Sequence, residues 1–151
     1  MAGPLRLLLL VLALSTAAML SGCAVVPFFG PHLSERECLM RAMYFESNRS
    51  SEEGLLAVGT VVMNRVGAPG YPRTICGVVG QPNQFASGVM SSPMRESSVG
   101  FVAQIADQVM HGARHPALGR TTHFHQAGLR FPYGNMHYVL EAGGNDFYEI
   151  W

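Results

Sequence analysis

The sequence predicts a single α+β domain that is mainly helical, with its helices first and a few short strands last. Three observations support this fold class. The chain has 151 residues, which suffices for one hydrophobic core but not for two substantial domains. Serine–glutamate capping signals at Ser34 and Ser50 each precede a run of apolar residues with helical spacing. Beyond Pro116, only short segments suited to strands remain.

The capping signals divide the first half of the domain into two helices. The first is expected from Ser34 through about Asn48. The second is expected from Ser50 to Val66, where Gly67 ends it. This second helix is apolar on nearly all sides, so it should be the buried central helix. It contains Gly54 and Gly59, which weaken a helix and therefore suggest the close approach of a neighbouring element.

The second half of the domain is expected to be less regular. Residues 67–100 are rich in glycine, proline and serine and should form mostly loop. A third helix is expected over residues 99–111, with an apolar and a polar face. Short strands are expected over residues 121–126, 137–140 and 146–151.

The composition excludes several kinds of chemistry. All ten basic residues are arginines, so lysine Schiff bases, a lysine general base and a P-loop are ruled out. The formal net charge is 0 and only 13% of the residues are charged, so no overall field steers the chain to nucleic acid.

The N-terminus predicts a secretory signal over residues 1–22. An apolar run follows one basic residue, and Leu20 to Cys23 (LSGC) looks like a bacterial lipobox. We therefore expect cleavage before Cys23, lipidation of this cysteine and a short tether through residue 33. The domain would then lie on the periplasmic side of the cell envelope, and Ala24 favours the outer membrane. The alternative is an uncleaved membrane helix, because no charge occurs between Arg6 and His32.

Among the ten carboxylates, Glu46 has an unusual position. Most of the others fall in the first turns of helices, where they complement the helix dipole, or on polar faces. Glu46 follows Leu39, Ala42 and Met43 at helical spacing, so it points where the apolar stripe points. Burial of a carboxylate raises its pKa and prepares it to donate a proton. The alternative is a structural ion pair with an arginine such as Arg49 or Arg65.

His123 and His125 are two residues apart and would share one face of a strand. One hypothesis is a zinc site that is completed by His111, His115 or Glu46. No Cys-x-x-Cys or His-Glu-x-x-His motif accompanies them. We therefore favour the other interpretation, in which one histidine is structural and the other orients the substrate or Glu46, without a metal.

Cys38 and Cys76 remain as a pair once Cys23 is lipidated. In an oxidising compartment they most simply form a disulfide between the first helix and the loop after the second. A nucleophilic cysteine paired with a histidine is the less favoured alternative, because it needs one thiol to be free.

The order of these motifs resembles the SleB/CwlJ-type cell-wall hydrolases over residues 34–148. The five blocks that carry the resemblance are Cys38–Glu46, Glu53–Val66, Tyr71–Val79, Gln84–Phe85 and Thr122–His125. The resemblance implies a lysozyme-like α+β domain with a groove for the glycan strands of peptidoglycan and no cofactor. It implies that Glu46 is the general acid.

The resemblance also assigns the other site residues. Gln84, Phe85, His123 and His125 would line the groove, with Asn64 and Arg65 near its floor. The chain departs from the family pattern in three places: at residues 47–50, at Ala86, and at residues 144–146, where the family's histidine is replaced by Asp146.

The carboxylate count suggests a mechanism. Glycosidases usually need two carboxylates, and only Glu46 is well placed, so we expect a lytic transglycosylase that cleaves between N-acetylmuramic acid and N-acetylglucosamine. Asp146 could instead position a water molecule and make the enzyme a hydrolase. A binding lipoprotein that holds peptidoglycan without cutting it, and a zinc amidase that uses His123 and His125, are the further alternatives.

Overall fold

The computed structural model describes residues 32–95 and 97–151. The predicted signal segment, the predicted lipidation site Cys23 and most of the predicted tether lie outside these residues. Within the described part of the chain, no helix is both long and apolar enough to cross a membrane. Residues Leu33–Trp151 form one compact unit.

Helix α2 (Glu35–Glu46) begins at the predicted capping box. The Ser34 hydroxyl accepts a hydrogen bond from the Glu37 backbone, and the Glu37 carboxylate accepts one from the Ser34 backbone. The helix ends two residues earlier than expected, because Ser47 adopts an extended conformation. Glu46 is consequently the last helical residue, at the point where the chain leaves the helix.

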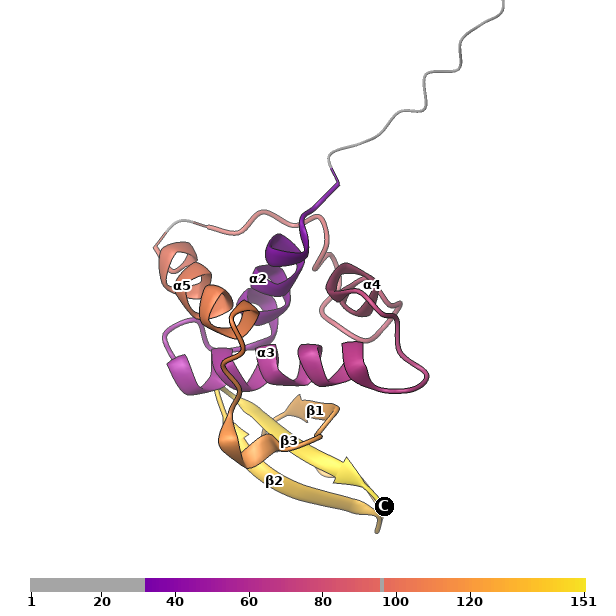
Figure 1. Ribbon diagram of the computed structural model, residues 1–151. Helices are drawn as coiled ribbons and strands as arrows, with labels where there is room; N and C mark the ends of the chain where they lie inside the picture. The colour runs from indigo at the N-terminus through magenta and orange to yellow at the C-terminus, as the bar shows by residue number, and fades with distance from the viewer. Residues whose placement is uncertain (1–31, 96) are drawn as a thin grey trace, which may run out of the picture. The chain divides into compact units, whose positions relative to one another are not determined.

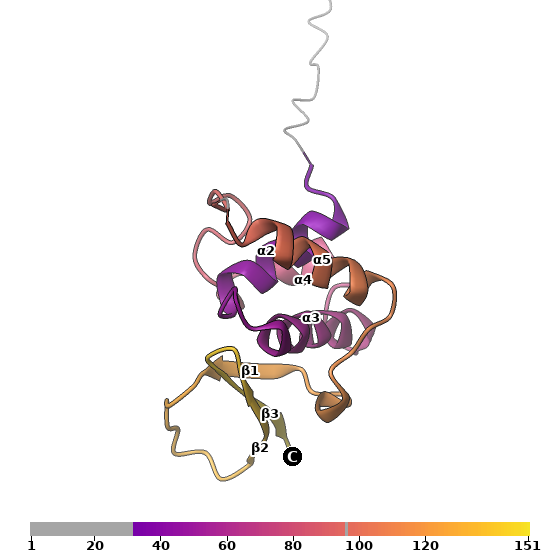
Figure 2. The same cartoon turned by 90° about the vertical axis from the view of Figure 1, so that its left-hand side faces the viewer.

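Helix α3 (Glu52–Gly67) is the central helix, as predicted. Helices α2, α4 and α5 lie on one side of it and the sheet lies on the other (Figure 1; Figure 2). The expected cap was wrong by one residue. Ser51, and not Ser50, accepts the hydrogen bond from the Gly54 backbone, while Ser50 bonds to the Asn48 side chain.

Helix α4 (Ile75–Val79) lies in the segment that was expected to be mostly loop. The Thr74 hydroxyl caps it by accepting from the Gly77 backbone at 3.0 Å. The Glu35 carboxylate on α2 accepts from the Ile75 backbone N–H, and Cys38 on α2 forms a disulfide with Cys76. Contacts with α2, remote in the sequence, thus stabilise this short helix.

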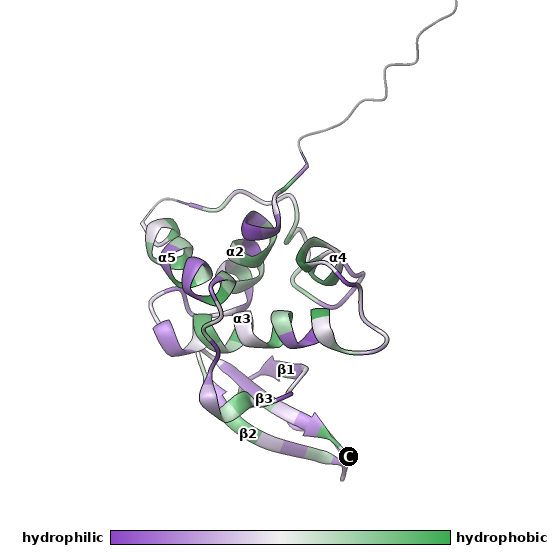
Figure 3. Ribbon diagram, in the orientation of Figure 1, coloured by the Kyte–Doolittle hydropathy of each residue, from purple (hydrophilic) through white to green (hydrophobic). Residues whose placement is uncertain are grey.

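Helix α5 (Val99–Met110) closely matches the expected third helix. Its apolar side packs into the core through Val102, Ile105 and Val109, which are fully buried. Figure 3 shows hydrophobic residues concentrated in α4 and α5, whereas β3 carries several hydrophilic ones. A short 3-10 helix (Pro116–Leu118) connects α5 to the sheet.

The sheet has three antiparallel strands in the order β1 (His123–Gln126), β3 (Asn145–Ile150) and β2 (Met136–Ala142). The last strand along the chain is therefore central. Phe124 pairs with Phe147, which is fully buried, so this face of the sheet lies against the helices. His125 pairs with Asp146, and His123 with Tyr148, so these four residues belong to the opposite, outer face.

The hairpin between β2 and β3 lies directly against the start of α3. Gly143 and Gly144 form its turn with φ values of 60° and 86°, which glycine adopts without strain. A Cβ atom at Gly54 would collide with the Gly143 backbone. The close approach that Gly54 suggested is therefore an approach of this hairpin, and at Gly59 the neighbour is Val109.

Candidate active site

Glu46 is held at the end of α2 by contacts from two distant segments. Its side-chain Oε1 accepts a hydrogen bond from the Ala86 backbone N–H. Its backbone carbonyl accepts from the Asn145 side-chain amide at 2.5 Å. Because Ala86 contributes only its backbone, the departure from the family's serine there leaves this contact to Glu46 intact.

The Glu46 carboxylate opens onto a cleft of about 390 Å³. The cleft lies between the end of α2, the loop after α4 and one end of the sheet. Its lining residues are Phe45, Glu46, Asn83, Gln84, Phe85, Phe124, His125, Gln126, Gly144 and Asn145. Among these described residues, Glu46 is the only carboxylate.

Burial raises the pKa of Glu46 above its ordinary value of 4.5. The Ala86 N–H and the positive charge of Arg65 act in the opposite direction, because both favour the ionised form. The loss of hydration is the larger effect. The carboxyl group therefore holds its proton to a higher pH than an exposed glutamate does.

Arg65 on α3 is the charged residue that influences the pKa of Glu46, and it is 4% exposed. Its Nε donates to the Thr122 carbonyl at 2.8 Å. Its guanidinium lies 5.3 Å from the ring centre of Phe85 and 5.7 Å from that of Phe124. Arg65 thus joins α3 to β1 beneath two aromatic residues of the cleft.

The structure does not place Glu46 in the alternative ion pair. Within residues 32–95 and 97–151, no salt bridge joins it to an arginine. Arg49 instead lies over the Tyr44 ring, 4.4 Å from its centre, and donates to the Tyr44 carbonyl. Arg65 influences Glu46 through its charge alone.

The two histidines of β1 lie on the same face of the sheet but in different surroundings. His125 lines the cleft, and its Nε2 is 3.1 Å from the Tyr138 hydroxyl. Its Nδ1 is 2.8 Å from the Gln126 carbonyl, which only accepts, so Nδ1 carries the proton and Nε2 accepts from Tyr138. His123 is not a lining residue. Its ring lies 5.4 Å from that of Tyr148, and burial together with Arg65 lowers its pKa.

The remaining predicted site residues also divide into some that line the cleft and one that does not. Gln84 and Phe85 line the cleft, as the resemblance implied. Asn64 does not, because its side-chain amide donates to the carbonyls of Gly119 and Thr121 and so holds the chain before β1. Asn64 therefore has a structural role, and its expected contact with substrate stays a prediction.

Several lining residues were missed by the sequence analysis. Asn145 is one, because its contact with Glu46 depends on the position of the hairpin. Asn83 is another, and it had a local signal. It follows Pro82 and has a φ of 60°, a left-handed conformation that asparagine tolerates better than most residues.

The proposed zinc ligands do not converge. Across the described ranges, no three His, Cys, Asp or Glu side chains are close enough to hold a metal ion. His115 lies 3.4 Å from Glu53 at the start of α3, and the His111 ring bonds to the Asp107 carbonyl on α5. Neither lines the Glu46 cleft, so the ligand set of a zinc amidase is not assembled.

A single half-buried acid in an open cleft is the arrangement that an enzyme needs for acid–base chemistry. The family model described as Cell Wall Hydrolase matches residues 49–148. The chain therefore belongs to the cell wall hydrolase family and is an enzyme that acts on peptidoglycan. Glu46 lies three residues before the matched segment.

Solved structures share the fold. One is the catalytic domain of the SleB protein from Bacillus cereus, with a TM-score of 0.61 and 19% identity over 80% of this chain and 94% of that one. Another is the catalytic domain of the germination-specific lytic transglycosylase SleB from Bacillus anthracis, with a TM-score of 0.59 and 20% identity over 80% and 99% of the two chains. No curated protein matches the sequence.

Proposed function

We propose that this enzyme is a lytic transglycosylase that cleaves glycan strands between N-acetylmuramic acid and N-acetylglucosamine, with Glu46 as acid and then base. The observation that carries the proposal is the single carboxylate among the described residues of the cleft. A glycosidase that uses a carboxylate nucleophile or a water-activating carboxylate would need a second one there.

The reaction proceeds in two proton transfers. Glu46 first gives its proton to the oxygen between the two sugars as the bond to C1 of the muramic acid breaks. The 6-hydroxyl oxygen of the same sugar then bonds to C1, and its proton returns to the Glu46 carboxylate. The product is a 1,6-anhydromuramic acid end, and no water is consumed.

The raised pKa of Glu46 supports its role in both steps. A carboxyl group that stays protonated to a higher pH is a better proton donor under ordinary conditions. The Ala86 N–H then stabilises the carboxylate that remains after the first transfer. The same contact fixes the direction in which Glu46 points.

The orientation of Asp146 argues against the hydrolytic alternative. Asn145 contacts Glu46 from the helix-facing side of β3, and the next residue, Asp146, therefore lies on the outer face. Asp146 is not among the residues that line the cleft, and its carboxylate accepts from the Gly128 backbone N–H, which supports a transglycosylase rather than a hydrolase that uses Asp146.

The cellular setting is part of the same proposal. The Leu20–Cys23 pattern and Ala24 lead us to propose a lipid-anchored enzyme on the periplasmic side of the envelope, with the outer membrane favoured. A short tether would keep the domain near its membrane.

Product analysis tests the proposed reaction. Purified peptidoglycan sacculi are incubated with the enzyme, and the released fragments are examined by mass spectrometry. We expect 1,6-anhydromuramic ends from the unaltered enzyme and none from Glu46→Gln. Glu52→Gln, which removes an exposed carboxylate at the start of α3, should behave like the unaltered enzyme.

Three outcomes would contradict the proposal. Reducing ends alone would make the enzyme a hydrolase, and released peptides would make it an amidase. Equal turnover by Glu46→Gln and the unaltered enzyme would remove Glu46 from the chemistry.

A further inference from the structure

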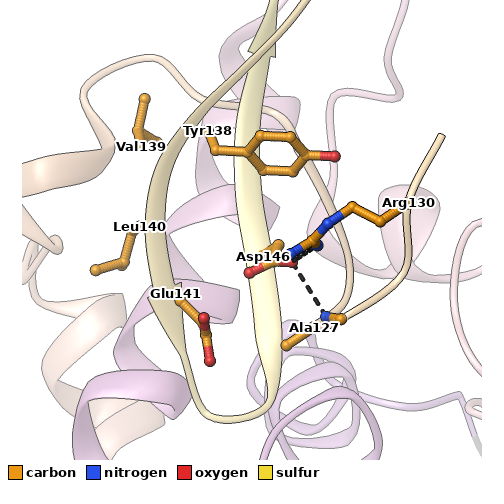
Figure 4. Close-up of a pocket in the computed structure, with 8 residues that line it drawn as sticks. Ala127, Arg130, Tyr138, Val139, Leu140, Glu141 and Asp146 are labelled. Carbon is orange, nitrogen blue, oxygen red and sulfur yellow. Dashed lines mark hydrogen bonds and ion pairs between the residues drawn. The ribbon is translucent and has the colours of Figure 1, made fainter. Parts of the chain in front are cut away.

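A second and larger cavity, of about 850 Å³, lies on the outer face of the sheet. It is formed by strands β2 and β3 and the segment that follows β1 (Figure 4). Its lining residues are Ala127, Gly128, Arg130, Tyr138, Val139, Leu140, Glu141 and Asp146. The reaction proposed for Glu46 uses none of them.

The cavity presents charges of both signs. Asp146 is 8% exposed, and its carboxylate accepts from the Gly128 backbone N–H at 3.3 Å. Glu141 is its direct partner across the β2–β3 pair, so two carboxylates face each other, an arrangement that is unfavourable without a nearby cation. Arg130 supplies part of the positive charge, because its Nη1 lies 4.0 Å from Oδ2 of Asp146. Its side chain is 81% exposed. Figure 4 shows it reaching toward Asp146.

Arg130 is not hydrogen-bonded to Asp146, and its Nη1 donates instead to the Leu129 carbonyl at 3.0 Å. A distance of 4.0 Å is too long for a hydrogen bond, and an exposed side chain turns easily toward another anion. A ligand with a carboxylate for Arg130 and an ammonium group for Glu141 and Asp146 would satisfy all three charges. The chemistry of the cavity thus matches a peptide that carries both groups.

The cavity and the Glu46 cleft are neighbours. Gln126 lines the cleft and the next residue, Ala127, lines the cavity. Likewise, Asn145 lines the cleft and the next residue, Asp146, lines the cavity. A side-chain contact also joins the two sites, because the Tyr138 hydroxyl in the cavity lies 3.1 Å from Nε2 of His125 in the cleft.

We propose that this cavity binds the stem peptide of the peptidoglycan strand whose glycan occupies the Glu46 cleft. This inference rests on the proposed function. Alternate sugars of peptidoglycan carry short peptides that have free carboxylates and, where they are not cross-linked, a free amino group. Three extended residues span about 10 Å, and the two sites are lined by adjacent residues, Gln126 and Ala127.

Binding measurements test this site without any bond cleavage. The full-length Glu46→Gln chain is titrated calorimetrically with a disaccharide–tripeptide whose third residue is diaminopimelate, and with the same disaccharide without its peptide. We expect the peptide-bearing ligand to bind about tenfold more tightly, as one or two charge-assisted hydrogen bonds would give. Acetylation of its free amino group should remove part of this difference.

Variants of exposed cavity residues locate the effect. Added to the same background, Arg130→Gln and Glu141→Gln should each reduce the preference for the peptide-bearing ligand several-fold and leave the affinity for the disaccharide unchanged. Acetylation should have a smaller effect in Glu141→Gln than in the Glu46→Gln background alone, because only Asp146 then remains to bind the ammonium group. Arg73→Gln, which removes an exposed charge from the loop before α4, should keep the full preference.

Two outcomes would overturn the inference: equal affinity for the two ligands, or a preference that survives both cavity variants. The outcomes are distinct from those for the proposed function. A chain that shows the preference but leaves no anhydro ends contradicts only the proposed reaction, and the converse contradicts only the peptide site.

Discussion

Glu46 is held by contacts that oppose one another electrostatically. Burial at the end of α2 favours the neutral carboxyl group, while the Ala86 N–H and Arg65 favour the ionised one. In the proposed reaction Glu46 first donates and then accepts a proton, and the Ala86 N–H and Arg65 serve the second step by limiting how far burial raises its pKa.

The burial of Glu46 predicts a pH-dependent gain in stability for Glu46→Gln. The folded-state pKa lies above the ordinary value of 4.5, so the folded protein loses stability as pH rises from 4.5 through the raised pKa. Glutamine carries no charge and avoids this loss. We expect Glu46→Gln to unfold at a higher temperature than the unaltered protein at neutral pH, and at a similar temperature at a pH well below 4.5. A gain that is equally large at low pH would contradict the account.

Arg65 predicts a shift in the pH dependence of activity. Its charge lowers the pKa of Glu46, and the general acid must be protonated to act. In Arg65→Gln the decline of kcat at high pH should therefore move to higher pH, whereas Arg65→Lys, which keeps the charge, should shift it less. Profiles of kcat between pH 4 and 9 would show this. If the decline of kcat at high pH did not move in Arg65→Gln, Arg65 would have no influence on the titration of Glu46.

At this scale, the sequence predicted the position of Glu46 on the apolar side of its helix but not the residues that contact it. The spacing of Glu46 after Leu39, Ala42 and Met43 is local information, and the structure places it at the edge of that apolar stripe. The contacts from Ala86 and Asn145 come from residues 40 and 99 positions away. No local pattern specifies them, because they depend on how the loop and the hairpin pack.

The elements around the site are positioned by a few close contacts. The β2–β3 hairpin meets α3 at Gly54, and the Asn48 backbone N–H donates to the Gly143 carbonyl at 2.8 Å. These contacts bring Asn145 to the end of α2. The position of the hairpin therefore helps to set the position of Glu46.

Substitution of Gly54 tests this arrangement. Gly54→Ala places a Cβ against the Gly143 backbone, which has no room to yield, so we expect a loss of about 1–3 kcal/mol in the free energy of unfolding and lower activity. A Cβ atom at Gly100 in α5 would meet nothing within 4 Å. Gly100→Ala should therefore stabilise the protein by up to about 1 kcal/mol, because alanine favours the helix. Urea unfolding measures both. Equal effects of the two substitutions would show that helix propensity alone, and not the hairpin, determines the result.

Helix and strand predictions differed in quality for physical reasons. Helices α3 and α5 were predicted within a few residues, since apolar spacing in both helices and the serines before α3 are local signals. Helix α4 was missed because its five residues carry too little periodicity. The strand order β1-β3-β2 was not predicted, because the pairing of distant strands leaves no mark on any single segment.

At the scale of the whole molecule, the disulfide between Cys38 and Cys76 closes a loop of 38 residues that includes all of α3. It joins α2 to α4, and the loop after α4 supplies Ala86, Gln84 and Phe85 to the cleft. A covalent link near the base of this loop limits how far it can move away from Glu46.

Loss of this disulfide should lower the free energy of unfolding more than it changes the local structure. The double variant Cys38→Ala, Cys76→Ala is expected to unfold about 4 kcal/mol more easily, because its unfolded chain gains freedom in a loop of this length. Urea unfolding under oxidising conditions measures the loss. Adding a reductant should bring the unaltered protein to the same stability and leave the double variant unchanged. A double variant as stable as the parent would show that the disulfide does not constrain the domain.

The central claim is that Glu46 is the only carboxylate acting at the broken bond and that the sugar's own hydroxyl replaces water. Digestion of purified peptidoglycan in water labelled with heavy oxygen tests it most directly. The account predicts fragments with anhydro ends that contain no label, and no such fragments from Glu46→Gln. Fragments that carry one labelled oxygen at the cleaved end would show that water attacks, and would contradict the account.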